Sequence, residues 1–314
     1  MRARAMARLG ALLVTACVSA AVSAQSVIGP SKFYVADSGA TAALVAQGLA
    51  LAAPSGFGPF LMVPAPGLRN VPSDAQATAV PWVDSNAWRF KRGITHARYP
   101  ALPRNLSPLA AAESFAFGVD AILNPDEADL PALGNFLRFA KAEGKPVLPT
   151  MANIGLVDDG SPVMDEVMNM LTRRNLLYRI VTRPDPSLSL FLQIGTDAFT
   201  RESAANPSDF AQRVRAWVGD DNRLVRVFNS NTLIAHLTGD GTRVRLFVLS
   251  YSRSRAQMAG AIVRVKGMYE PSHFAAFGAA PGDGLTDLQH PGNATEFTLP
   301  GFDTLAIIDL APVR

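Results

Sequence analysis

Val119-Asp120-Ala121-Ile122-Leu123 precedes a helical pattern over residues 129–143, and Pro146-Val147-Leu148 follows it. The first and third segments are short apolar runs, which are typical of buried strands. Between them, apolar side chains recur at helical spacing until Gly144 ends the pattern; they are Leu130, Leu133, Phe136, Leu137 and Ala140. Strand, helix and strand in this order predict parallel strands with a helix packed across them.

The same alternation continues on both sides of this stretch. On the N-terminal side we expect strands at 32–36, 60–63 and 79–83, and helices at 40–52 and 107–115, the second with Ser107 as its cap before Pro108. On the C-terminal side, Ser161-Pro162 predicts the start of a helix that ends at residue 173, and a strand follows at 176–181. The polar side of that helix, which includes Asp165 and Asn169, is expected to face water.

Residues 25–205 are therefore predicted to form an α/β domain, in which flanking helices cover a mostly parallel sheet. The order of the elements does not distinguish an open sheet from a partial barrel, although a full eight-unit barrel needs more units than the chain offers. After a helix at 208–218, ended by Gly219, only strands are predicted, and Gly239-Asp240-Gly241 forms a hairpin turn between two of them. These strands predict a C-terminal antiparallel β-sandwich over residues 206–314; they are expected at 223–228, 232–237, 243–250, 261–266, 295–299 and 304–310.

The first 24 residues have the pattern of a secretory signal peptide. Arg2, Arg4 and Arg8 precede an apolar run over residues 9–22, and Val22-Ser23-Ala24 is a small-residue cleavage site. The protein is therefore expected to be exported, to the periplasm or the extracellular space. Val14-Thr15-Ala16-Cys17 offers an alternative, a lipobox that would place a lipid anchor on Cys17. No segment of the remaining chain has the length and hydropathy of a transmembrane helix.

Removal of this segment changes what the composition implies. It takes three of the 29 basic residues, none of the 26 acidic ones and the single cysteine, so the rest of the chain has equal numbers of both charges and no thiol. The basic isoelectric point thus comes from the export signal and does not indicate a nucleic-acid partner. The sequence also lacks the G-x-S-x-G, H-E-x-x-H, P-loop and G-x-G-x-x-G motifs, so the corresponding hydrolase, zinc-protease and nucleotide-binding classes have no support.

The densest group of candidate binding residues follows the strand expected at 79–83. Trp82, Asp84, Asn86, Trp88 and Arg89 combine two indoles with a carboxylate, an amide and a cation. Indole faces stack on the apolar side of a sugar ring, while Asp and Asn bond its hydroxyls, so this pattern favours a sugar or carboxylate site. The alternative is structural: the tryptophans anchor the core, and Asp84 and Asn86 cap a turn.

Two further acidic groups follow predicted strands. Asp158 and Asp159 precede the helix that starts at Pro162, where they could act as general acid or base or simply favour the positive end of the helix. The loop at 124–129 is expected to cap the next helix, because the regular ligand spacing of a calcium loop is absent. The sequence predicts no metal site and no cofactor.

Some stretches of the chain resemble known families. Residues 263–269 and the strand after Pro300-Gly301-Phe302-Asp303-Thr304 are similar to strands of the accessory sandwiches at the back of secreted glycoside hydrolases. Residues 82–90, 113–123 and 166–181 resemble a family of secreted bacterial proteins with no assigned activity.

The first resemblance implies a carbohydrate-active protein with an oligosaccharide partner, in which two carboxylates flank the scissile bond. Asp84 and one of Asp158 or Asp159 would then be the acid and base, although the chain has no pair of glutamates at strand ends. Two alternatives stay open. One is a non-catalytic exported binding protein on a glycosidase-like scaffold; the other is an α/β domain that resembles glutamine amidotransferases but has lost its thiol and acts as a scaffold.

Overall fold

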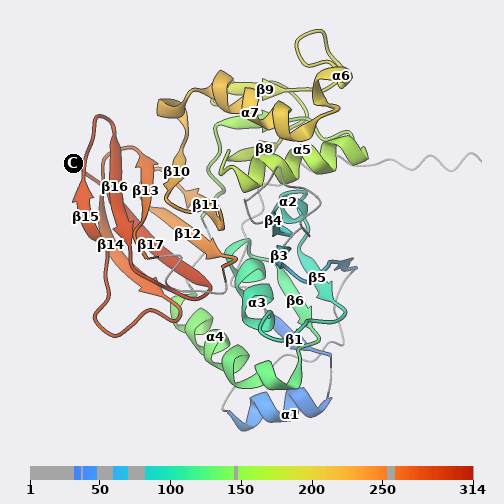
Figure 1. Ribbon diagram of the computed structural model, residues 1–314, viewed down its shortest axis with the longest axis vertical. Helices are drawn as coiled ribbons and strands as arrows, with labels where there is room; N and C mark the ends of the chain where they lie inside the picture. The colour runs from blue at the N-terminus through green and yellow to red at the C-terminus, as the bar shows by residue number, and fades with distance from the viewer. Residues whose placement is uncertain are drawn as a thin grey trace, which may run out of the picture.

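The computed structural model describes residues 32–36, 38–47, 59–69, 82–144, 148–252 and 259–313 (Figure 1). The expected signal peptide, Cys17 and most of the strand expected at 146–148 lie outside these ranges. Figure 1 shows the C-terminal strands beside two α/β layers, with α1 and α4 at one end of the molecule and α5 and α7 at the other.

The first layer is a four-stranded parallel sheet. Its order is β1 (Phe33–Val35), β6 (Asp120–Leu123), β5 (His96–Tyr99) and β2 (Leu61–Met62). Strands β2, β5 and β6 pair in the order of the chain, and β1 pairs with β6. Within the described residues β1 and β2 are the edge strands, so this part of the sheet is open between them. The helices of this layer are α1 (Ser38–Ala46), α3 (Ser107–Ala116) and α4 (Leu130–Glu143).

The second layer is a three-stranded parallel sheet in the order β8 (Tyr178–Ile180), β7 (Ile154–Leu156) and β9 (Leu190–Leu192). Helices α5 (Pro162–Arg173) and α7 (Pro207–Val218) share one hydrophobic cluster with it, and α6 (Arg201–Ala204) is a single turn. An antiparallel pair, β3 (Gly67–Arg69) with β4 (Trp82–Asp84), precedes the short helix α2 (Ala87–Phe90).

The C-terminal part consists of two four-stranded antiparallel sheets, as expected for a sandwich. One has the order β10 (Val225–Phe228), β13 (Ala261–Lys266), β16 (Ala294–Leu299) and β15 (Thr286–Gln289). The other has the order β11 (Leu233–Gly239), β12 (Val244–Ser250), β17 (Leu305–Pro312) and β14 (Tyr269–Ala276). Side chains from both sheets form one buried cluster. The predicted fold class, parallel α/β followed by an antiparallel sandwich, is confirmed.

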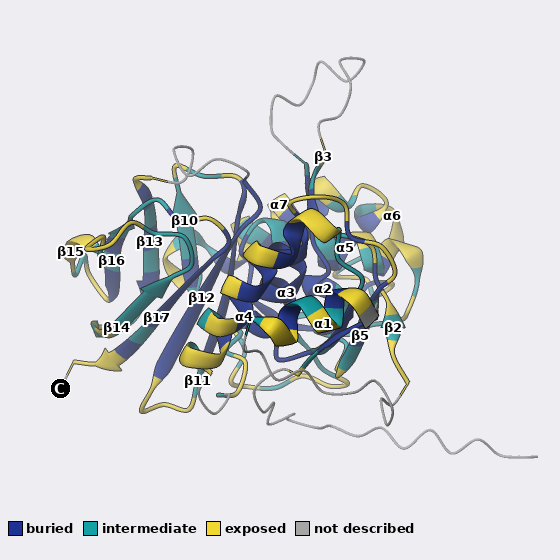
Figure 2. Cartoon of the chain, turned by 90° about the horizontal axis from the view of Figure 1, so that it is seen from below, coloured by how far each residue is buried: buried dark blue, intermediate teal, exposed yellow. Residues whose placement is uncertain are grey.

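Helix α3 joins the sandwich to the first parallel sheet. All ten of its residues are buried, and it lies near the centre of the molecule in Figure 2. Phe247 and Leu249 of β12 belong to the same hydrophobic cluster as Leu109 and Phe115 of α3, so one core spans both parts. None of the helices within the described ranges is long and apolar enough to cross a membrane.

The two predicted helix caps have different outcomes. Ser161 caps α5 as expected, since its Oγ accepts a hydrogen bond from Met164 N at 3.2 Å. The prediction for Ser107 was wrong: Ser107 lies inside α3, and its hydroxyl donates to Asp129 at 2.7 Å. The Asp129 carboxylate also accepts from the backbone amides of Asn105 and Ser107, so a distant side chain performs the cap. Within the acidic loop, Asp126 caps the turn η1 (Glu127–Asp129).

Candidate functional site

A cavity of about 360 Å³ opens where β4 ends and α2 begins. We call it the Asp84 cavity and define it by Arg69, Asp84, Asn86, Trp88, Arg89 and Glu166, all of which line it. The chain leaves β4 at Asp84 and enters α2 at Ala87, so the short connection between them brings these side chains to one place. Four of the five residues predicted from the sequence cluster therefore line one cavity, and Trp82 lies beside it at the start of β4.

Asp84 is held by an arginine from the neighbouring strand. Its Oδ1 accepts a hydrogen bond from Arg69 Nη2 at 2.7 Å, and its Oδ2 forms an ion pair with Arg69 Nε at 2.5 Å. The hydrogen bond to Asp84 raises the pKa of Arg69, although burial opposes this change. The register of the antiparallel pair places Arg69 opposite Trp82 and Gly67 opposite Asp84, so this ion pair runs diagonally across the two strands.

Helix α5 contributes two residues that the sequence analysis did not select. Glu166 and Asn169, three positions apart on the helix, both line the Asp84 cavity. The polar side of α5, which includes Asn169, was expected to face water. In the structure Asn169 is half-buried, and residues of the distant β4–α2 connection line the same cavity. The sequence signal was a polar helix face, which by itself does not distinguish a cavity wall from an ordinary surface.

The tryptophans do not offer free ring faces to a ligand. Trp88 is only 6% exposed and belongs to the hydrophobic cluster of the second layer. The guanidinium groups of Arg89 and Arg92 lie over its ring, 4.1 and 5.3 Å from the centroid. Arg173 lies 3.8 Å from the ring centroid of Trp82. The indole rings thus pack against arginines, and one of these, Arg89, lines the cavity.

The floor of the cavity is a buried hydrogen-bonded network around Glu113 of α3. Glu113 Oε1 accepts from Ser85 Oγ and from Asn86 N, both at 2.7 Å. The side-chain amide of Asn86 donates to Glu113 Oε2 at 3.0 Å and to Pro64 O at 2.9 Å, and its Oδ1 accepts from Arg89 at 3.2 Å. Asn86 is therefore fully bonded inside the protein and positions Arg89.

Glu113 is a carboxylic acid in an unusual environment. It is fully buried, and burial raises its pKa above the ordinary value while the hydrogen bonds from Tyr251, Ser85 and Asn86 oppose the rise. Tyr99 Oη also lies within 3.4 Å of its second oxygen. The network is well satisfied, and it fixes the connection from which Asp84 and Arg89 reach the cavity.

Asp158 and Asp159 are not among the residues that line the Asp84 cavity. Arg92 donates to both oxygens of Asp158, at 2.6 and 3.0 Å, and also pairs with Asp165 at 2.6 Å. Burial acts to raise the pKa of Asp158, but the Arg92 guanidinium and the Gly160 amide outweigh it and lower that pKa. Asp159 accepts from Ser161 N at 2.9 Å, and hydrogen bonding to Ser161 lowers its pKa as well. Both carboxylates thus brace the start of α5.

The comparisons show a likeness of fold. No family model and no curated protein matches this chain. Among solved structures, the α-L-fucosidase isoenzyme 2 from Paenibacillus thiaminolyticus has a TM-score of 0.53 at 8% identity, over 73% of this chain and 63% of the fucosidase. A GH42 β-galactosidase from G. stearothermophilus has a TM-score of 0.36 at 7% identity, over 81% of this chain and 54% of the other.

The chain thus spans less than two thirds of the length of these solved structures. At 8% identity the likeness to the fucosidase concerns the fold alone, since one fold supports many functions. The fold of this chain, parallel α/β layers with a β-sandwich, is similar to that of the fucosidase over the matched part.

Proposed function

We propose that this chain is an exported carbohydrate-binding protein on a glycosidase-like scaffold and that the Asp84 cavity holds the saccharide. The observation that carries the proposal is the lining of the cavity. Arg69 and Arg89 supply donors, Asp84 and Glu166 supply acceptors, and Asn169 supplies both. Such a mixture of planar donors and acceptors matches vicinal hydroxyl groups better than it matches an apolar ligand. The likeness of the fold to a fucosidase supports the same class of ligand.

Glycoside hydrolysis is the second candidate, because two carboxylates, Asp84 and Glu166, line one cavity. Glu166 is exposed and could exchange protons with solvent, whereas both oxygens of Asp84 are occupied by Arg69. Binding is therefore better supported than catalysis. An acid or base role for Asp158 or Asp159 stays a prediction, and the geometry favours a structural role for both.

The test of binding uses the protein from Gln25 onward and a panel of neutral oligosaccharides in thermal-shift experiments. A saccharide present at 100 times its dissociation constant adds about 2.7 kcal/mol to the free energy of unfolding. Asp84→Asn and Glu166→Gln should each raise the dissociation constant of the saccharide about tenfold or more, and the stabilisation should fall accordingly. Glu127→Gln, an exposed residue of η1, is the matched control and should behave as wild type. The absence of stabilisation by every saccharide would refute the proposed ligand class.

Hydrolysis is tested separately by detecting new reducing ends when a stabilising saccharide has been found. Activity that disappears in both Asp84→Asn and Glu166→Gln supports catalysis in the Asp84 cavity. Activity that disappears in both Asp84→Asn and Asp158→Asn but is retained in Glu166→Gln would instead favour the acid–base pair predicted from the sequence.

Export has its own test. Mass spectrometry of the protein recovered from the producing cells should show an N-terminus at Gln25. A lipid-modified N-terminus at Cys17 would show that the protein is anchored to a membrane. An intact Met1 would contradict export.

A further inference from the structure

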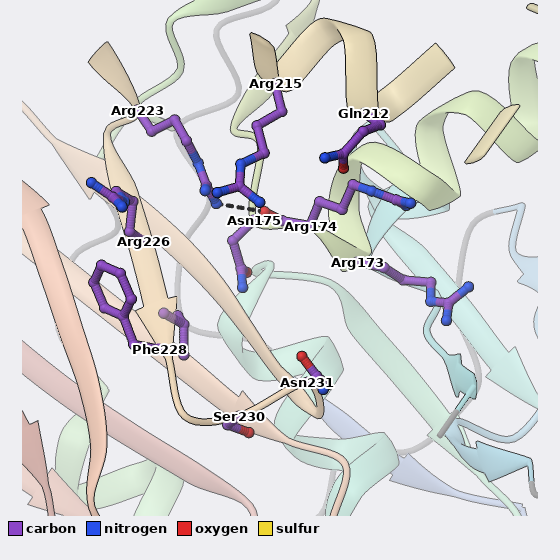
Figure 3. Close-up of a pocket in the computed structure, with 11 residues that line it drawn as sticks. Arg173, Arg174, Asn175, Gln212, Arg215, Arg223, Arg226, Phe228, Ser230 and Asn231 are labelled. Carbon is purple, nitrogen blue, oxygen red and sulfur yellow. Dashed lines mark hydrogen bonds between the residues drawn. The ribbon is translucent and has the colours of Figure 1, made fainter. Parts of the chain in front are cut away.

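A second cavity, of about 420 Å³, lies where α5 and α7 meet the first strand of the sandwich (Figure 3). Five arginines line it: Arg173, Arg174, Arg215, Arg223 and Arg226. We call it the arginine cavity. The five arginines come from four segments. Two stand at the end of α5 and directly after it, one belongs to α7, one follows η2 (Asp220–Asn222), and one belongs to β10. The fold therefore gathers five cations around a single space.

The carboxylates near this cavity do not balance the guanidinium groups. Asp220 serves three of them, with ion pairs to Arg215 at 2.8 Å, Arg223 at 3.4 Å and Arg226 at 3.6 Å. Figure 3 shows the guanidinium groups of Arg215 and Arg223 close together at one end of the cavity. One negative charge is thus shared by three positive charges, and this part of the cavity keeps a positive excess.

The other two arginines contact neutral groups. Arg173 and Arg174 donate to the thioether of Met170, at 3.7 and 3.6 Å, and Arg174 also donates to Ser208 Oγ at 3.0 Å. Neither forms an ion pair with a carboxylate among the described residues. Burial, together with the charge of Arg174, lowers the pKa of Arg173 to about 10, although the charges of Asp84 and Glu166 oppose this change.

Hydrogen-bond donors are also left over around the cavity. The Arg223 side chain is only 9% exposed, and its buried Nε has no acceptor among the residues that the structure describes. The same holds for the buried Nε of Arg226. Buried donors normally find partners, so this cluster holds more donors than the protein's own acceptors satisfy. An added oxyanion would supply both the missing charge and the missing acceptors.

We propose that the arginine cavity binds a phosphate or sulfate group carried by a small organic ligand. Guanidinium groups recognise tetrahedral oxyanions through paired hydrogen bonds, and several of them on one anion give specificity for a doubly charged group. The cavity is larger than a single oxyanion and has the size of a small-molecule site. Its other walls include Phe228, Gln212 and Asn231, which offer an aromatic face and amides to the organic part. This inference does not depend on the proposed saccharide site.

The experiment is a set of titrations followed by calorimetry and thermal shift, at constant ionic strength maintained with chloride. The probes are inorganic phosphate, inorganic sulfate, glucose 6-phosphate, glucose 6-sulfate and glucose. We expect both esters to bind and to stabilise the protein, with glucose at least tenfold weaker because it lacks the charged group. Tighter binding of glucose 6-phosphate or glucose 6-sulfate would identify the natural group as a phosphate or a sulfate. Equal effects of all anions and chloride would overturn the proposal.

Two variants locate the site. Arg174→Gln and Arg226→Gln should each weaken binding of the esters about tenfold or more, since each removes one cation from the cavity. Arg243→Gln is the control, because Arg243 is an exposed cation of the β11–β12 turn with an ion pair to Asp240. It removes the same charge elsewhere and should bind as wild type. Circular dichroism checks folding, and either cavity variant suffices if the other fails to fold. Unchanged ester binding in a folded cavity variant would overturn the proposal.

Discussion

Tyr251 Oη donates a hydrogen bond of 2.6 Å to Glu113 Oε1, and this bond ties the end of β12 in the sandwich to helix α3. Ser85 Oγ and Asn86 N donate to the same oxygen, each at 2.7 Å. One buried carboxylate oxygen thus joins three segments that are far apart in the sequence. Because Ser85 and Asn86 also line the Asp84 cavity, this carboxylate sets the position of the cavity against the sandwich.

The Glu113 carboxyl predicts a pH dependence of stability. Burial raises its pKa in the folded protein, so the folded state holds more protons than the unfolded state once the pH exceeds the ordinary value of 4.5. The contribution of Glu113 to stability is therefore largest at low pH and falls as the pH rises. Glu113→Gln removes this dependence, so the stability of wild type relative to the variant should decrease from pH 4 to pH 7. Urea unfolding at several pH values measures it.

Glu127→Gln is the control for this experiment, because Glu127 is exposed. Its stability relative to wild type should stay constant over the same pH range. A wild type that gains stability over Glu113→Gln as the pH rises would show that the hydrogen bonds outweigh burial and that the pKa of Glu113 is lowered.

Local sequence patterns predicted much of the fold. Strand β6 and helix α4 lie within about a residue of the segments expected at 119–123 and 129–143. Their signals are local: the spacing of apolar residues defines both elements, and Gly144 marks the end of the helix. Strand β14, by contrast, was not predicted. Its residues Tyr269–Ala276 are mostly half-buried and include Pro271, which interrupts the pattern at a β-bulge. What decides this strand is its pairing with β17, and that pairing is not local.

The candidate site shows the same division. The cluster around Asp84 was found because its residues are adjacent in the sequence, at the end of a strand. The adjacent residues Arg173 and Arg174 could be recognised from the sequence as possible anion ligands, although a basic helix end is also expected from the helix dipole alone. Glu166 and the rest of the arginine cavity were not selected, because their residues meet only through packing. Arg223 Nη2, for example, donates a hydrogen bond of 2.7 Å to the Arg174 carbonyl. Separation along the chain hides such clusters from any reading of neighbouring residues.

Asp158→Asn should lower stability and leave saccharide binding unchanged. The substitution removes the charged, bidentate contact with Arg92. The cost is limited to about 1–2 kcal/mol, because Asp165 still pairs with Arg92. The pKa of Asp158 is lowered in the folded protein, so its contribution is present above the ordinary value of 3.8 and is lost as the pH falls through the lowered value. The difference from wild type should be full at pH 7 and smaller at pH 3. Asp197→Asn, at an exposed position, should show no difference at either pH.

Gly155→Ala should destabilise the second parallel sheet. A methyl group built at Gly155, in the middle of β7, would lie 2.7 Å from Leu188 Cδ1 and 3.0 Å from Val181 Cγ2. Both neighbours would have to move, and such overpacking costs about 1–3 kcal/mol. Gly284→Ala is the matched control, since nothing lies within 4 Å of its methyl position. Equal melting temperatures for the two variants would contradict the packing described for β7.

Lys91→Met should stabilise the protein at neutral pH. The Lys91 ammonium donates to Tyr178 O at 3.3 Å and lies over the rings of Tyr178 and Phe117, 4.8 and 5.8 Å from their centroids. Burial lowers the pKa of Lys91 from 10.5 to about 8, so between these values the unfolded state holds more protons and stability rises with pH. At pH 7 the buried charge is a net cost, and its replacement by an apolar side chain of similar length should add about 1–3 kcal/mol to the free energy of unfolding.

The gain in stability from Lys91→Met, measured by urea unfolding, should be smaller at pH 10 than at pH 7. The control is Lys141→Met, at an exposed position of α4, which should show no gain at either pH. His236 packs against Phe117, with ring centroids 4.3 Å apart; burial and, after it, the positive charge of Lys91 lower the pKa of His236. A destabilised Lys91→Met at both pH values would mean that the contacts of the ammonium group outweigh its desolvation.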